Sequence, residues 1–397
     1  MPDPRNSAWS PLYYLASVGA GGLTVTFFMW LYFWVPHPGS PVPLFNHVVA
    51  AFAAGQPLSR AMIALAAAGI AVFAWMNLSL LVWNLRAHRA FHGSEAEAQL
   101  KRSNGQTQLM ALPLAIAMSI NVGFILGMIF VPGLWSVVEY LFPAALLAFL
   151  LTGALALRQL GAFLGRVLTE GGFDFGANGS FAQMLPAFAL AMVGVGLSAS
   201  AAMSTTVATA GVAVVLSSFF FMASAIVAAV SMILGVWSMF RHGAAREALP
   251  TVMVVIPLLT VLGILLLRQN HGLHAHFGGH SDPAAILILL TRIFSVQILF
   301  GLLGVALLRR SGYAAEFLHG ERRSAGAYAL VCPGVALMVM GMFWVNKGLV
   351  GAGIIASHGA AYWTLSAALI AVQAASIALV LYLNRRHFRT SALAQPA

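Results

Sequence analysis

The single cysteine, Cys332, is the side chain best suited to covalent chemistry in this sequence. It stands directly before Pro333 inside an apolar run, where a proline leaves a helix carbonyl without its usual N–H partner. A thiol beside freed backbone and water could react as a thiolate. A small buried hydrophobe is the other interpretation, and both stay open. One cysteine cannot form an internal disulfide or complete a dithiol cycle within one chain.

A glycine-containing segment places several histidines close together. Imidazole and carboxylate groups at such short spacing could bind zinc, copper or nickel. The spacing matches no standard site, and a solvated or pH-sensitive loop is the usual explanation. The weak candidate ligands are His271, His274, His276 and His280, followed by Asp282. We therefore expect neither a metal nor another cofactor.

Three basic residues are candidates for attracting anions. Arg268 and Lys347 end two predicted membrane helices at the same mouth, where clustered cations would raise the local anion concentration. Basic helix ends are also ordinary interface anchors. Arg292 falls inside an apolar run, so it should face protein or water because exposure to lipid costs several kcal/mol. Pairing with Glu139 and snorkelling outward are the alternatives to an anion site.

Prolines, glycines and small polar residues recur within the apolar runs and are candidates for lining a pore. A proline frees a carbonyl that only protein or a water-filled cavity can satisfy, and glycine allows close approach of backbone. Hydroxyl and amide side chains also make hydrogen bonds between helices, which is the alternative role. With Cys332 and Pro333, the pore and gate candidates are Pro113, Pro186, Pro257, Gly21, Ser119 and Asn121.

The elements that would position these residues are membrane helices. Hydrophobic residues make up 60% of the chain and charged residues only 8%, which excludes an ordinary soluble domain. Apolar runs long enough to span a bilayer recur throughout, so we predict an all-α integral membrane protein. The ten predicted spans lie near residues 11–35, 59–85, 108–131, 133–157, 181–204, 207–239, 249–268, 284–308, 327–347 and 361–384.

The distribution of basic residues predicts the orientation. With the amino terminus inside, the inner loops and tails hold sixteen lysines and arginines, and the outer side holds three. This bias places both termini in the cytoplasm and fits the inner (cytoplasmic) membrane of a bacterium. We expect a cytoplasmic tail at 1–10, which contains Arg5, one transmembrane domain at 11–384 and a second cytoplasmic tail at 385–397. The net charge of +10 reports this topology and not nucleic-acid binding.

Short outer turns and long charged inner connections predict that consecutive spans pair as hairpins. Spans 3, 5, 7 and 9 each carry one of the four prolines, spaced by 73, 71 and 76 residues, which indicates repetition. Odd-numbered spans should therefore line the interior. Even-numbered spans, such as the sixth with its three consecutive phenylalanines, should face lipid.

Ten spans, inner termini, paired helices and prolines in successive odd spans resemble the tellurite-resistance and dicarboxylate transporter family, which includes the TehA proteins and plant slow anion channels. The stretches Leu249–Leu267 and Ala327–Phe343 look like its seventh and ninth helices. The resemblance implies five helical hairpins around a quasi-fivefold central pore lined by the odd helices. It also implies a homo-oligomer, namely a trimer in which each subunit conducts.

One position departs from the family pattern. In that family a phenylalanine precedes the proline of the ninth helix and its ring plugs the pore, whereas here the residue is Cys332. Either the constriction is wider, or another residue closes it, or the thiol takes part in redox or sulfur chemistry. The opening of the first span and the Cys-Pro-Gly sequence also resemble the TsoY-type branch, which is related to selenoproteins.

These observations predict a channel or passive transporter for small anions, and not an enzyme. We find no Walker-type nucleotide-binding motif, and carboxylates are scarce within the spans. The partners expected are the lipid bilayer and a small inorganic or organic anion. The alternative is a membrane redox protein that acts through Cys332 with a partner thiol or selenol.

Overall fold

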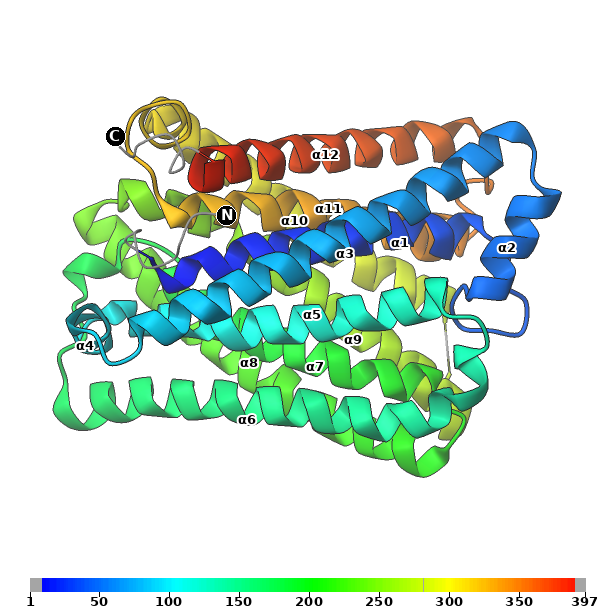
Figure 1. Ribbon diagram of the computed structural model, residues 1–397, viewed down its shortest axis with the longest axis horizontal. Helices are drawn as coiled ribbons and strands as arrows, with labels where there is room; N and C mark the ends of the chain where they lie inside the picture. Colours follow the sequence, from blue (N-terminus) through cyan, green and yellow to red (C-terminus); the bar gives the residue numbers. More distant parts are fainter. Residues whose placement is uncertain (1–8, 281, 390–397) are drawn as a thin grey trace, which may run out of the picture.

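The computed structural model describes residues 9–280 and 282–389, and every regular element in them is a helix (Figure 1). Arg5 and most of both predicted tails lie outside the described residues. The α-helices are α1 (Tyr14–Trp34), α2 (Phe45–Ala54), α3 (Pro57–Phe91), α4 (Glu95–Lys101), α5 (Ala111–Phe130), α6 (Val138–Glu170), α7 (Leu185–Met203), α8 (Val207–His242), α9 (Val255–His276), α10 (Pro283–Arg310), α11 (Val331–Phe343) and α12 (Ala360–Asn384).

Ten helical segments of the described chain are long and apolar enough to cross a membrane, which confirms the predicted all-α membrane fold. They lie roughly parallel in one bundle (Figure 1). The segments are Pro11–Trp34, Pro57–Phe91, Asn104–Phe130, Leu134–Glu170, Ala182–Met203, Val207–His242, Arg246–His276, Pro283–Arg310, Ala325–Val350 and Ala360–Phe388, numbered below as spans 1 to 10. Span 4 continues well past the predicted end at 157 because α6 remains helical to Glu170.

Burial alternates along the chain as the sequence pattern predicted. In the most apolar window of each odd span, 89, 61, 94, 72 and 67% of the residues are buried. The corresponding values for the even spans are 39, 39, 28, 11 and 22%. Because the exposed residues of the even spans are mostly apolar, this outer surface suits a lipid bilayer.

The odd spans contact one another in the interior. α1 packs against α5 and α11, α7 packs against α5 and α9, and α9 packs against α11. Each of these helices also packs against the α-helix of the following even span. The two ends of the bundle are named here by their short helices, the α2 end and the α4 end; α1 begins and α12 ends at the α4 end (Figure 1).

Polar side chains on even spans hold the odd spans in place. Asn77 on α3 donates to the Ser17 carbonyl on α1 over 2.8 Å, and Ser224 on α8 donates to the Ala187 carbonyl on α7 over 2.8 Å. Gln297 on α10 donates to the Ile256 carbonyl on α9 over 2.9 Å, and Gln373 on α12 donates to the Thr26 hydroxyl on α1 over 2.9 Å. Where no water is available, such bonds satisfy groups that would be costly to leave unpaired.

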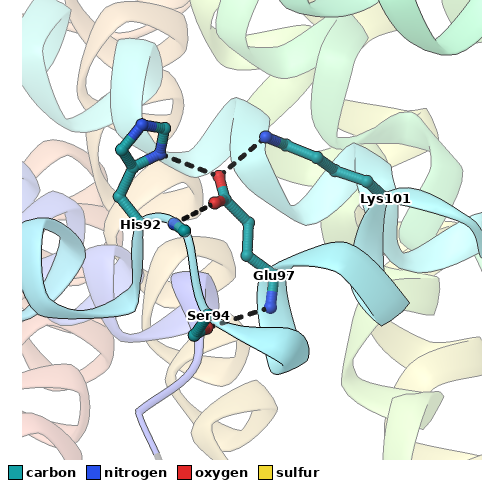
Figure 2. Close-up of polar contacts among 5 residues, drawn as sticks. His92, Ser94, Glu97 and Lys101 are labelled. Atoms are coloured by element: carbon teal, nitrogen blue, oxygen red, sulfur yellow. Dashed lines mark hydrogen bonds and ion pairs between the residues drawn. The ribbon is translucent and has the colours of Figure 1, made fainter.

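A buried carboxylate fixes the connection between α3 and α4 at the α4 end (Figure 2). Glu97 is 5% exposed and lies 2.8 Å from the Lys101 ammonium and 3.2 Å from His92 Nδ1. Its carboxylate also accepts the Gly93 N–H over 2.7 Å, while the Ser94 hydroxyl caps α4 by accepting the Glu97 N–H over 3.2 Å. Burial by itself would raise the pKa of Glu97, but hydrogen bonds from Lys101, Gly93 and His92 outweigh it and lower that pKa to about 2.

Candidate functional site

A cavity of about 220 Å³ lies inside the bundle toward the α2 end. All five odd spans line it, for example through Gly22, Asn121, Met192, Ile264 and Val339. The connection between α1 and α2 covers it with Val42 and Leu44, and the first two residues of α2, Phe45 and Asn46, also line it. This space is called the α2-end cavity below, and its lining is largely apolar.

A second cavity, of about 260 Å³, lies toward the α4 end. The early residues of four odd spans line it, among them Leu15, Leu185, Thr251 and Ala329, together with Gln108 of the remaining odd span. This space is called the α4-end cavity below. The two cavities therefore occupy opposite halves of the same set of helices.

Phe188, Pro257 and Cys332 line both cavities. They come from α7, α9 and α11, and the level at which they meet is called the constriction below. Phe188 is 3% exposed and Cys332 is 7% exposed. Their side chains are therefore packed at the constriction and do not border an open passage between the two cavities. The two cavities thus abut end to end at a closed point.

The prolines occupy a position different from the one the sequence suggested. Each odd span begins with a 3₁₀ segment and then becomes α-helical, and the prolines stand second or third in the α-helical part. Pro186 is second in α7, and Pro113, Pro257 and Pro333 are third in α5, α9 and α11. Each proline is thus internal to its span, as expected, and the difference is that it lies where the 3₁₀ part changes to α-helix. The constriction lies at this change of helix type.

Arg268 lies eleven residues beyond Pro257 on α9 and lines the α2-end cavity. Its Nη1 donates to the Val195 carbonyl oxygen on α7 over 2.8 Å. No carboxylate pairs with it among the described residues, and no other charged side chain of that part of the chain lines this cavity. The half-buried guanidinium is therefore a source of positive potential inside an apolar chamber.

The other two basic candidates lie elsewhere. Lys347 is exposed on a π-helical segment, Trp344–Val350, and is not among the lining residues of either cavity. Arg292 is exposed on α10, the most exposed of the spans. Its suggested partner, Glu139, instead accepts hydrogen bonds from Ser204, Thr205 and Thr206, because these residues form the tight turn before α8.

The small-residue candidates divide between cavity wall and helix packing. Asn121 lines the α2-end cavity, and its Nδ2 donates to the Ala117 carbonyl over 3.0 Å. Gly21 packs against neighbouring helices, since an added Cβ would lie 2.7 Å from Met118 and 2.9 Å from Asn77; Gly22 faces the cavity in its place. Ser119 is buried and lines neither cavity. Pro113, Pro186 and Pro333 also lie outside both linings.

The histidine-rich segment is largely helical and not a loop. α9 continues to His276, whose Nε2 donates to the Ser204 carbonyl over 2.8 Å, so that His271 and His274 also lie on helix. The helix can continue because Gly272 packs directly on α7, where an added Cβ would lie 2.3 Å from the Ala201 carbonyl oxygen. In the described residues, no group of three His, Cys, Asp or Glu side chains converges as a metal site.

Sequence reasoning missed Phe188, which shares the constriction with Cys332. The only signal in the sequence was that Phe188 stands two residues after Pro186. Val335 stands two residues after Pro333 in the same way, and it also lines the α2-end cavity. It also missed the role of the α1–α2 connection and the start of α2, whose four lining residues carry no distinctive motif.

Comparison of the sequence with protein-family models gave no match, and comparison with curated proteins also gave none.

Proposed function

We propose that this chain is a membrane channel or passive transporter for small anions, with a pathway through the two cavities. The observation that carries the proposal is that all five odd spans line both cavities, which share Phe188, Pro257 and Cys332; span 4 and the α1–α2 region complete the wall of the α2-end cavity. Two chambers that abut end to end inside a membrane bundle form a route interrupted at one level. A route of this kind needs only a local movement to conduct.

The constriction supplies the gate. The Phe188 ring takes the place that the transporter-family resemblance would give to a phenylalanine before Pro333, while the smaller Cys332 thiol lies at the same level. A change of the Phe188 rotamer would join the cavities without moving a helix. Such a gate explains how the path can be closed although Cys332 has replaced the expected ring.

Anions are the favoured cargo because the sole charge on the wall of the α2-end cavity, within the described residues, is the Arg268 guanidinium. In an apolar chamber its field is weakly screened and raises the local concentration of negative ions. One cation without a matching carboxylate attracts an anion but does not trap it by several contacts. Conduction requires this weak binding.

The overall arrangement proposed is five hairpins around a quasi-fivefold pore. The packing of each odd span on the next even span, and of the odd spans on one another, supports it. We further propose the orientation given by the basic residues, with both termini cytoplasmic in a bacterial inner membrane. A trimer and membership of the tellurite-resistance and dicarboxylate transporter family complete the proposal; both rest on the resemblance.

Anion flux into proteoliposomes tests the function. Chloride, nitrate, sulfite and selenite are compared for the wild type, Phe188→Ala and Cys332→Phe. We expect Phe188→Ala to conduct faster than the wild type because the ring that fills the constriction is gone. Cys332→Phe should conduct least, since a second ring enters the same level. Phe294→Ala, on partly buried packing outside both linings, is the matched control and should conduct like the wild type.

One result of the flux experiment would contradict the proposed channel. If no anion enters with any variant, while Cys332 still reacts with a thiol reagent, the channel is excluded. That outcome favours the redox alternative, in which a partner thiol or selenol uses the Cys332 sulfur.

A further inference from the structure

The α2-end cavity has an apolar middle and a charged outer part. Arg268 stands eleven residues beyond Pro257, so its backbone lies about 16 Å farther along α9 than the constriction. Between these levels the wall is formed by Met118, Met192, Val261, Ile264 and Val339, one or two from each of four helices. A bare inorganic ion would contact only a small part of this apolar surface.

Of the other polar groups of the wall, the Thr260 hydroxyl is occupied and Asn121 is partly occupied, whereas the exposed Asn46 amide is uncharged and makes no hydrogen bond among the described residues. The Thr260 hydroxyl lies 3.1 Å from the Ala336 carbonyl and receives a hydrogen bond from Gln297 over 2.7 Å. The Asn121 amide donates to the Ala117 carbonyl of its own helix. None of these side chains carries a charge, so Arg268 is the only group of this wall, within the described residues, that can neutralise an anion.

Arg268 retains free donors. A guanidinium carries five N–H groups, and among the described residues Arg268 donates only from Nη1, to the Val195 carbonyl. An N–H pair on another edge of the guanidinium remains to bind a planar group with two oxygens, which is the geometry of a carboxylate. A dianion would need a second cation, and the cavity wall has none in the described residues.

We infer that the α2-end cavity binds organic monoanions, with a carboxylate on Arg268 and an apolar chain against the middle of the wall. This inference rests on the proposed function and deepens it, because it names the substrate class of the same pathway. The charged group then selects for one negative charge, and the apolar wall selects for the attached chain. Inorganic anions enter as weaker ligands of Arg268 alone.

Binding of straight-chain carboxylates to the purified full-length chain in detergent tests the site. We expect affinity at pH 7 to rise from acetate to hexanoate by about fourfold for each added methylene, because each methylene leaves water for an apolar wall. Hexanamide, which has the same chain without the charge, should bind at least about tenfold more weakly than hexanoate. Succinate should bind more weakly than hexanoate because its second carboxylate finds no cation.

Variants separate the two parts of the site. Arg268→Gln should lower the affinity for every carboxylate by a similar factor and leave the increase per methylene unchanged. Ile264→Thr should reduce that increase and leave acetate binding unchanged. Arg292→Gln, an exposed residue on α10, is the matched control and should bind like the wild type. The same detergent without protein gives the background due to partition into micelles.

Nitrate flux in proteoliposomes tests the proposed channel function separately from carboxylate binding in the α2-end cavity. We expect hexanoate to slow nitrate flux, since both ligands occupy Arg268. Equal affinity for acetate, hexanoate and hexanamide would overturn the inference and leave nitrate flux as independent support for the channel. Hexanoate binding without flux of any anion, even in Phe188→Ala, would overturn the proposed function and with it the role of this ligand as a substrate.

Discussion

Arg268 on α9 donates a hydrogen bond from Nη1 to the Val195 carbonyl oxygen on α7 over 2.8 Å. Both residues line the α2-end cavity, so this bond holds the guanidinium at the wall of the chamber. A long basic side chain would otherwise extend toward water. The charge is thus placed inside the α2-end cavity, on the proposed anion path, by a contact between two neighbouring odd spans.

The first prediction concerns this charge. Arg268→Gln should lower nitrate flux on the order of tenfold, because it removes the weakly screened positive charge of the cavity. Initial rates in proteoliposomes measure the effect. Arg292→Gln and Lys347→Gln remove a positive charge outside the cavity walls and should change the rate little. Equal loss in all three variants would mean that net charge matters and the position of Arg268 does not.

The second prediction concerns access to the thiol at the constriction. Cys332 is the sole cysteine and is 7% exposed, so a charged thiol reagent should modify the wild type slowly. Phe188→Ala should increase the rate on the order of tenfold, which corresponds to about 1.4 kcal/mol of barrier. Mass spectrometry of intact protein follows the modification. The mutation Phe294→Ala tests whether loss of any ring has this effect, and we expect it to leave the rate unchanged.

The spans and their alternation could be predicted from sequence for a physical reason. A helix that faces lipid must be apolar along its exposed surface, and ten such runs are visible without any knowledge of contacts. The interior position of the odd spans followed from Pro113, Pro186, Pro257 and Pro333, which repeat at nearly equal spacing. The spacing gave no information on the 3₁₀ segments that precede them, because those segments depend on packing across the bundle.

The site was harder to predict because it depends on long-range contacts. Phe188 is one of 26 phenylalanines, and only the fold brings it to the level of Cys332. The helical extension to His276 likewise depends on the contact of Gly272 with Ala201. By contrast, Arg268 could be singled out from sequence because it ends a predicted interior span, although the sequence also allowed an ordinary interface anchor there.

The third prediction tests packing between odd and even spans. Gly196 on α7 lies against α6, where an added Cβ would be 2.2 Å from the ring of Phe149. Phe149 is 1% exposed and has no space to move, so Gly196→Ala should destabilise the protein by about 1–3 kcal/mol. Gly123→Ala on α5 is the control, because nothing lies within 4 Å of its added Cβ. Thermal unfolding in detergent should show a lower Tm for Gly196→Ala alone, and equal Tm values would contradict this packing.

The fourth prediction uses the buried carboxylate at the α3–α4 connection (Figure 2). Glu97→Gln removes the charge that pairs with Lys101 and His92, and should destabilise the protein by about 1–3 kcal/mol at pH 7. Glu95→Gln, an exposed substitution on the same helix, should have a much smaller effect. Thermal unfolding of the two variants and the wild type measures the difference.

The pH dependence of that difference follows from the pKa of Glu97, which folding lowers from 4.5 to about 2. A group whose pKa is lower in the folded state adds stability above its unfolded pKa and loses that contribution as the pH falls through the folded value. The advantage of the wild type over Glu97→Gln should therefore be complete above about pH 4.5 and should decline between pH 4.5 and 2. An advantage that stays constant down to pH 2 would show that the carboxylate is not held ionised by Lys101, Gly93 and His92.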